Sequence, residues 1–79
     1  MFHNNFVKKN NLSIFAKRLK ELMQLQSLSI SKLSQETGIP KSTINCWLLQ
    51  IRSPQIDSLV EIADYFGVTI DYLLGREDI

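Results

Sequence analysis

A glycine at position 38 separates two short helical segments, and this restricts what the chain can fold into. The first segment is predicted over residues 30–37, with Ser29 as its N-terminal cap. Gly38 follows directly, at a position where a left-handed residue ends a helix. Pro40 precedes the second segment, which is predicted over residues 41–49. Proline lacks a backbone N–H, but this costs nothing at the start of a helix, where the N–H groups have no partner within the helix. The chain is therefore predicted to turn sharply between two short helices.

The second of these segments has two chemically different faces. Its apolar face carries Ile44, Trp47 and Leu48, which predicts burial against a core. The opposite face is short and polar, and it comprises Lys41, Ser42, Asn45 and Cys46. The major groove of DNA admits an α-helix, and short polar side chains can reach base edges there. The pattern indicates a protein that reads a DNA sequence rather than a catalyst.

The remaining chain predicts three further helices, which makes the fold all-α with five short helices. They are expected over residues 14–26 after a Ser13 cap, over residues 56–66, and from a Thr69 cap to about residue 74. Gly67 and Gly75 each fall just beyond an expected helix end, as Gly38 does. Residues 1–12 contain four Asn and lack a helical period, so they are predicted to form a flexible N-terminal arm before one domain at residues 13–79.

The charge of the chain is divided unevenly along its length. Residues 1–54 hold eight Lys or Arg against two acids, a formal charge of +6. Residues 55–79 hold one Arg against six acids, a formal charge of −5. The two parts return the net charge of +1. The basic part contains the two closely spaced helices, which favours a polyanionic partner, although chance clustering on a solvated surface explains the asymmetry equally well.

Composition excludes several other classes of protein. At 79 residues and 44% apolar content the chain has room for one domain and one core. No apolar run approaches the roughly 20 residues of a membrane helix. A single cysteine, Cys46, excludes an internal disulfide and fits a reducing, cytoplasmic setting. No Gly-rich phosphate loop, nucleophile–base pair or metal-ligand spacing is present, so we predict no enzyme, metal site, cofactor or small-molecule site.

Taken together, three segments resemble one known family. They are residues 15–22 (Phe-Ala-Lys-Arg-Leu-Lys-Glu-Leu), residues 33–47 around Gly38, and residues 59–75 after Pro54. The chain from Phe15 to Gly75 is thereby similar to the lambda-repressor-like (XRE/Cro-type) helix-turn-helix family. The resemblance implies a compact five-helix domain that binds double-stranded DNA as a transcriptional regulator of the repressor type, with the helix at residues 41–49 in the major groove.

The resemblance also implies roles for individual residues. Base contacts fall on Lys41, Ser42, Asn45 and Cys46, and contacts to the DNA backbone fall on Ser29, Ser31, Thr43, Arg52 and Ser53. Members of the family typically bind near-palindromic operators as homodimers, some of which assemble only on DNA. The dimer contact is then expected near Ile51 and Ile70.

The sequence departs from the family pattern at four places. Ile30 replaces a common Gln that contacts DNA, and Gln50 replaces a common Gly at the end of the third helix, so Gln50 must either be left-handed or let the helix continue. Met23 and Leu48 replace an Arg–Glu pair, which predicts that the two pack on each other as an apolar substitute.

The fourth departure supports an alternative function. Leu49 and Ile51, together with Leu25, are candidates for an exposed apolar patch. The apolar surface of Leu49 and Ile51, with Ile30 in place of Gln, would fit a protein–protein interaction module that retains the fold without binding DNA.

Overall fold

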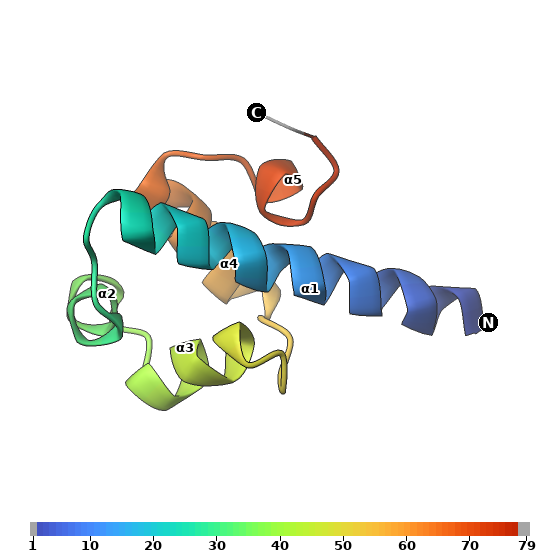
Figure 1. Ribbon diagram of the computed structural model, residues 1–79, viewed down its shortest axis with the longest axis horizontal. Helices are drawn as coiled ribbons and strands as arrows, with labels where there is room; N and C mark the ends of the chain where they lie inside the picture. Colours follow the sequence, from blue (N-terminus) through green and yellow to red (C-terminus); the bar gives the residue numbers. More distant parts are fainter. Residues whose placement is uncertain (1, 78–79) are drawn as a thin grey trace.

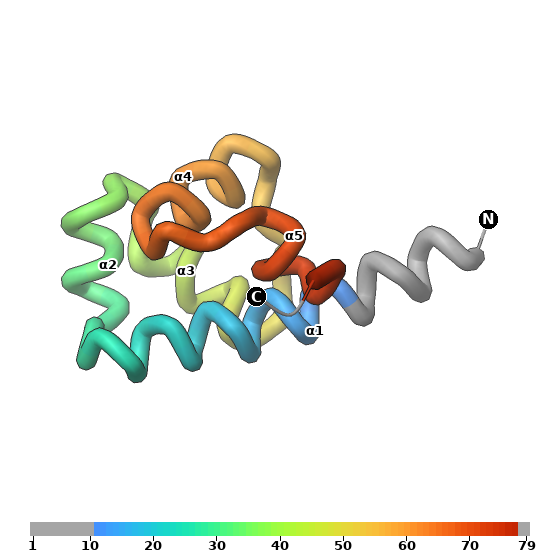
Figure 2. The backbone as a smooth tube through the Cα atoms, turned by 90° about the horizontal axis from the view of Figure 1, so that it is seen from above, coloured from blue at the N-terminus to red at the C-terminus, as the bar shows by residue number. Residues whose placement is uncertain are grey.

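The computed structural model describes the backbone of residues 2–77 and the side chains of residues 11–77. This part of the chain forms five helices: α1 (Phe2–Leu25), α2 (Ile30–Thr37), α3 (Lys41–Leu48), α4 (Ile56–Phe66) and α5 (Ile70–Leu73). Figure 1 shows α3 below α1 and α5 above it, while α2 lies at the C-terminal end of α1. In Figure 2 α1 lies along one side of the molecule and α4 along the other. The predicted all-α five-helix fold is confirmed.

The core is apolar and receives side chains from every helix. Its largest fully buried members are Phe15, Leu19, Leu33, Ile44, Trp47, Ile62 and Leu73. The rings of Phe15 and Trp47 meet edge to face, with their centroids 5.6 Å apart. None of the polar or charged side chains among residues 11–77 is buried. Apolar burial is therefore the main contribution to the stability of this fold.

Most helix ends follow the local sequence signals. The hydroxyls of Ser29 and Thr69 accept hydrogen bonds from the N–H groups of Lys32 and Tyr72, which confirms both predicted caps. Gly38, Gly67 and Gly75 are all left-handed, as expected at helix ends. α2 and α4 have the predicted bounds, and α3 and α5 each end one residue earlier than predicted.

The start of the first helix was predicted wrongly. Ser13 lies inside α1 and does not cap it. Asn11 and Leu12 also belong to α1, and the Asn11 side-chain amide donates a 2.7 Å hydrogen bond to the carbonyl of Leu74. This contact spans 63 residues of sequence and cannot be read from a local pattern. The backbone of residues 2–10 also belongs to α1, whereas the flexibility predicted for the arm at residues 1–10, whose side chains lie outside the described ones, stays a prediction.

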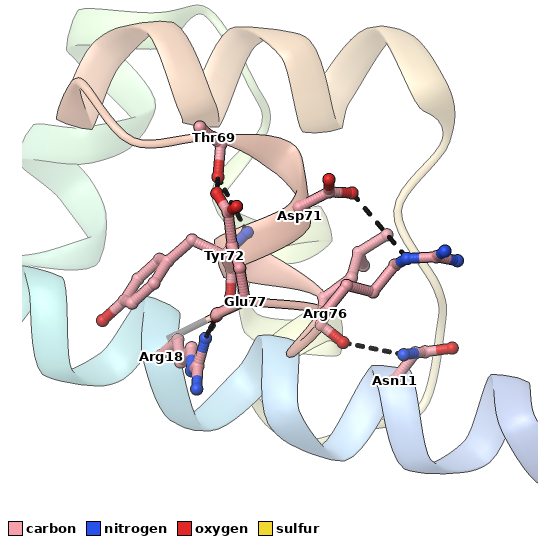
Figure 3. Close-up of polar contacts among 8 residues, drawn as sticks. Asn11, Arg18, Thr69, Asp71, Tyr72, Arg76 and Glu77 are labelled. Carbon is pink, nitrogen blue, oxygen red and sulfur yellow. Dashed lines mark hydrogen bonds and ion pairs between the residues drawn. The ribbon is translucent and has the colours of Figure 1, made fainter. Parts of the chain in front are cut away.

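Polar contacts from α1 also hold the segment that follows α5, as Figure 3 shows. The Arg18 guanidinium donates to the carbonyls of Tyr72 and Glu77, at 2.5 and 2.7 Å, and lies over the Tyr72 ring. The Thr69 hydroxyl donates to the Glu77 carboxylate. A single arginine of α1 therefore ties the acidic C-terminal segment to the side of α1 that faces away from α3.

Gly75 combines a left-handed backbone with a close neighbour. Its φ is +81°, and a Cβ built there would lie 2.7 Å from Cδ1 of Ile14. Gly67 has a similar φ of +70° but no atom within 4 Å of such a Cβ.

We expect Gly67→Ala to lower the free energy of unfolding by about 1 kcal/mol, from backbone strain alone. Gly75→Ala should lower it by about 2–3 kcal/mol because overpacking is added. Urea unfolding of both variants checks this, and equal losses would contradict the role of Ile14.

Gln50 adopts the left-handed conformation at the end of α3, with φ +61°, where the family usually has Gly. The N–H groups of Gln50 and Ile51 donate to the carbonyls of Trp47 and Cys46, at 3.0 and 2.9 Å. This is the Schellman pattern, which satisfies two carbonyls at the helix end. Of the two alternatives at Gln50, the structure therefore has the strained one, and α3 does not run on.

Met23 and Leu48 occupy the expected apolar environment. Met23 is buried, and the half-buried Leu48 packs against the core cluster that contains Met23. A direct contact between the two side chains stays a prediction. We expect Leu48→Glu to lower the free energy of unfolding by about 1–3 kcal/mol, because it replaces an apolar side chain packed against this cluster with a carboxylate, whose cost Lys17 and Lys20 beside it only partly offset. Met23→Arg/Leu48→Glu should recover part of the loss by pairing. Thermal unfolding measures both, and an unchanged Tm for Leu48→Glu would contradict the packing role.

Candidate nucleic-acid interface

The turn between α2 and α3 is held by hydrogen bonds and by one buried side chain. The Gly38 N–H donates to the Ser34 carbonyl at 2.8 Å. The Thr37 hydroxyl donates to the Leu33 carbonyl at 2.8 Å and accepts from the Ile39 N–H at 3.3 Å. Ile39 itself is buried in the core. These contacts fix the direction in which α3 leaves α2.

Burial of one face of α3 sets which face points outward. Ile44 and Trp47 are buried, so the helix presents its other side to solvent. On that side Lys41, Ser42 and Asn45 are exposed and Cys46 is half-buried. No hydrogen bond or ion pair joins these four side chains to other side chains among residues 11–77. The structure therefore brings the four predicted base-contacting residues onto one accessible helix face.

The start of α2 carries two of the predicted backbone-contacting residues. Ser29 and Ser31 are both exposed, and the Ser29 oxygen already accepts from the Lys32 N–H at 3.0 Å. The Ser29 hydroxyl proton remains able to donate to a phosphate oxygen. Ile30, between them, is half-buried and packs against the core. Ile30 therefore has a packing role where the family commonly has a polar contact.

The other three backbone-contacting candidates line one groove. Thr43 of α3 and Arg52 and Ser53 of the following loop surround a depression of about 410 Å³. Gln55 and Ser58, at the start of α4, line the same groove and were not identified from the sequence. N–H groups in the first turn of a helix lack intrahelical partners, and the helix dipole favours anions there. The groove thus combines a guanidinium, hydroxyls and a helix N-terminus, although Asp57 in that first turn opposes an anion.

Basic side chains also lie beside the C-terminal end of α3. Lys17 and Lys20 of α1 line a depression together with Leu48 and Gln50. Both lysines are exposed, and sequence reasoning did not single them out. The acids of the C-terminal part lie on α4, on α5 and after α5. Because α5 and α3 lie on opposite sides of α1 (Figure 1), part of this negative charge is kept away from the outer face of α3.

The predicted apolar patch does not form as a single surface. Leu49 and Ile51 are exposed at the end of α3, but Leu25 lies at the far end of α1, where it lines a depression with Leu22 and Tyr72. Figures 1 and 2 both place the C-terminal ends of α1 and α3 apart. Grouping Leu25 with the other two was therefore wrong, because the sequence does not reveal where helix ends meet.

The two predicted dimer-contact residues differ in accessibility. Ile51 is 69% exposed, whereas Ile70 is half-buried and packs against the core. Two further apolar residues on α4, Ile56 and Val60, are also exposed and were not identified from the sequence. They are four residues apart and so share one helix face.

The described part of the chain contains no group of three or more His, Cys, Asp or Glu side chains able to hold a metal ion. None of its helices is both long enough and apolar enough to cross a membrane.

Comparison with known proteins agrees with this geometry. A family model described as helix-turn-helix matches residues 19–73, more than half of the chain. HTH-type transcriptional regulator AnsR of Bacillus subtilis (strain 168) is 38% identical over 60 residues, which cover 76% of this chain and 52% of AnsR. An uncharacterized HTH-type transcriptional regulator of the same organism, YobD, is 31% identical over 65 residues, covering 82% of this chain and 58% of YobD.

A third relative, HTH-type transcriptional regulator ImmR of Bacillus subtilis (strain 168), is 27% identical over 63 residues, covering 80% of this chain and 50% of ImmR. The chain thus spans between half and three-fifths of the length of these relatives. No solved structure matches it. The family match includes α2, the turn at Gly38 and α3, and the resemblance seen in the sequence is confirmed: the chain belongs to the lambda-repressor-like helix-turn-helix family.

Proposed function

We propose that the chain is a sequence-specific double-stranded DNA-binding domain of a transcriptional regulator, acting as a repressor by occupying its operator. The observation that carries the proposal is the outward face of α3. Lys41, Ser42 and Asn45 are exposed on a helix whose other face is buried against α1 and α2. All three relatives are named as transcriptional regulators, which agrees with this reading.

The side chains on this face have the chemistry for base readout. An amide such as Asn45 can bond bidentately to adenine, and an ammonium such as Lys41 can donate to guanine O6 and N7. The Ser42 hydroxyl suits either a base or a phosphate. The half-buried Cys46 completes the face, one turn after Ser42. We assign base contacts to these four residues.

Phosphate contacts would fix the register of α3 in the groove. We assign them to Ser29 and Ser31 at the start of α2, and to Thr43, Arg52 and Ser53 around the groove at the start of α4. Arg52 is the cation among them, and a cation placed on a phosphate releases counterions, so affinity should fall as salt rises. Such contacts position the protein and carry no sequence information directly.

A single α3 reads few base pairs, so we propose that two copies bind a near-palindromic operator as a homodimer. Ile51 is exposed and accessible for a contact between copies, while Ile70 contributes only from a half-buried position. The site of action proposed is the cytoplasm, on DNA. The proposed role requires no enzyme activity and no cofactor.

Binding-site selection from random duplex DNA near physiological salt tests the proposal. We expect enrichment of a motif with two-fold symmetry, and an affinity for it that falls steeply as salt rises. Enrichment of a motif without two-fold symmetry would support sequence-specific DNA binding and contradict the proposed homodimer. Absence of any enriched duplex would overturn the proposed function.

The alternative of an interaction module gains no support. Its motivation was Ile30 and the exposed Leu49 and Ile51; Ile30 packs against the core, and the three relatives are all named as transcriptional regulators.

A further inference from the structure

Leu49 is an apolar side chain on a face that is otherwise built for polar contacts. It is 60% exposed, directly after the last residue of α3. Its backbone is still helical, with φ −86° and ψ −1°, and its N–H donates to the Asn45 carbonyl at 3.0 Å. Leu49 therefore continues the helical periodicity of α3.

Helical geometry places Leu49 in line with the predicted base-contacting residues. It follows Ser42 by seven residues, which at 3.6 residues per turn leaves it within about 20° of Ser42 around the axis. It follows Asn45 by four residues, one turn further along the helix. At about 1.5 Å per residue, Leu49 lies about 10 Å from Ser42 along α3.

The neighbouring exposed isoleucine does not share this position. Gln50 is left-handed and ends the helix, and the Ile51 N–H turns back to the Cys46 carbonyl at 2.9 Å. Ile51 therefore leaves the periodicity of α3. The structure separates two residues that the sequence groups together: Leu49 belongs to the outer face of α3, and Ile51 belongs to the loop.

We propose that Leu49 determines specificity by packing against the C5-methyl group of a thymine in the major groove. This inference rests on the proposed function. A leucine side chain has no donor or acceptor, so it cannot bond to phosphates or to the polar base edges. The thymine methyl is the apolar group that base pairs present in the major groove, and apolar side chains contact it. Contact would remove from water the apolar surface that Leu49 exposes in the free protein.

The test compares thymine with deoxyuridine, which lacks only the C5-methyl group. Each thymine of the selected duplex is replaced in turn, with its symmetry mate, and the Kd of the wild type, Leu49→Ala and Ile51→Ala is measured. At one symmetric pair of positions we expect the wild type to bind the uridine duplex about fourfold more weakly per site. Leu49→Ala should bind both duplexes equally there. Ile51→Ala should keep the wild-type ratio of the two Kd values, because loss of a contact between copies weakens both duplexes by one common factor.

Several outcomes would overturn the assignment. In one, Leu49→Ala keeps the full difference between the thymine and uridine duplexes at every position. In another, Leu49→Ala binds all duplexes more weakly by one common factor, which is the result expected if Leu49 made a contact between protein copies. The assignment would also be contradicted if replacing thymine by deoxyuridine changed the Kd of the wild type at no position of the selected motif. Each of these results would contradict the role of Leu49 and still be compatible with DNA binding by the wild type. If the wild type selected no duplex, the proposed function would be contradicted as well.

Discussion

Lys41→Ala/Asn45→Ala should lower the affinity for the selected duplex by about 100-fold or more, because each good base contact contributes about 1–3 kcal/mol of discrimination. Both side chains are exposed and unpaired within the described residues 11–77, so the Tm should stay near that of the wild type. Titration of a labelled duplex near physiological salt measures the loss. Circular dichroism confirms that the fold is kept.

Arg52→Ala is the matched control for this double variant. Arg52 lies in the groove at the start of α4, away from the outer face of α3. We expect Arg52→Ala to lower the affinity for the selected duplex and for an unrelated duplex by a similar factor. The slope of log affinity against log salt concentration should fall in magnitude by about 1. The double variant should instead lose its preference for the selected duplex. A double variant that still enriches the wild-type motif would show that Lys41 and Asn45 do not read bases.

Trp47→Ala should have the largest effect on stability, a loss of about 3–5 kcal/mol in the free energy of unfolding. Trp47 is fully buried and meets the Phe15 ring edge to face, so its removal leaves a large cavity between α1 and α3. A domain of this size has a total stability of about 4–12 kcal/mol. The variant should therefore be partly or wholly unfolded near 37 °C, and DNA binding should be lost with the position of α3.

Urea unfolding followed by circular dichroism measures this loss, since the variant lacks the tryptophan fluorophore. Trp47→Phe is the control, because it keeps a ring against Phe15 and should lose less than Trp47→Ala. A Trp47→Ala variant with an unchanged midpoint would show that α3 is held by other contacts.

Much of the fold follows from local chemistry that a sequence displays. Ser29 and Thr69 cap helices because a hydroxyl can accept from an N–H three residues later. Gly38 and Gly67 end helices because glycine adopts positive φ without strain. The apolar spacing within 41–48 identified the buried face of α3, and with it the polar face opposite. These signals act over one or two helical turns, so they can be recognised without knowing how the rest of the chain packs.

Other features depend on which distant segments meet. The prediction failed at Ser13, because α1 continues through a region whose Asn11 bonds to the Leu74 carbonyl. Gln50 is left-handed although its residue type disfavours that conformation, because the Schellman hydrogen bonds and the packing of α3 hold it there. Leu25 was wrongly grouped with Leu49 because exposure alone does not place two helix ends together.

The class of fold, the helix order, most helix ends and the polar face of α3 can be read from the amino-acid sequence, since each of these depends on periodicity and capping within a short stretch. The packed fold was needed to see that Thr43, Arg52 and Ser53 share one groove with Gln55 and Ser58. It also separated Leu49, on the helix face, from Ile51, in the loop. These relations depend on how α1, α3 and α4 pack and on where the backbone turns, and long-range packing is not encoded in any single local pattern.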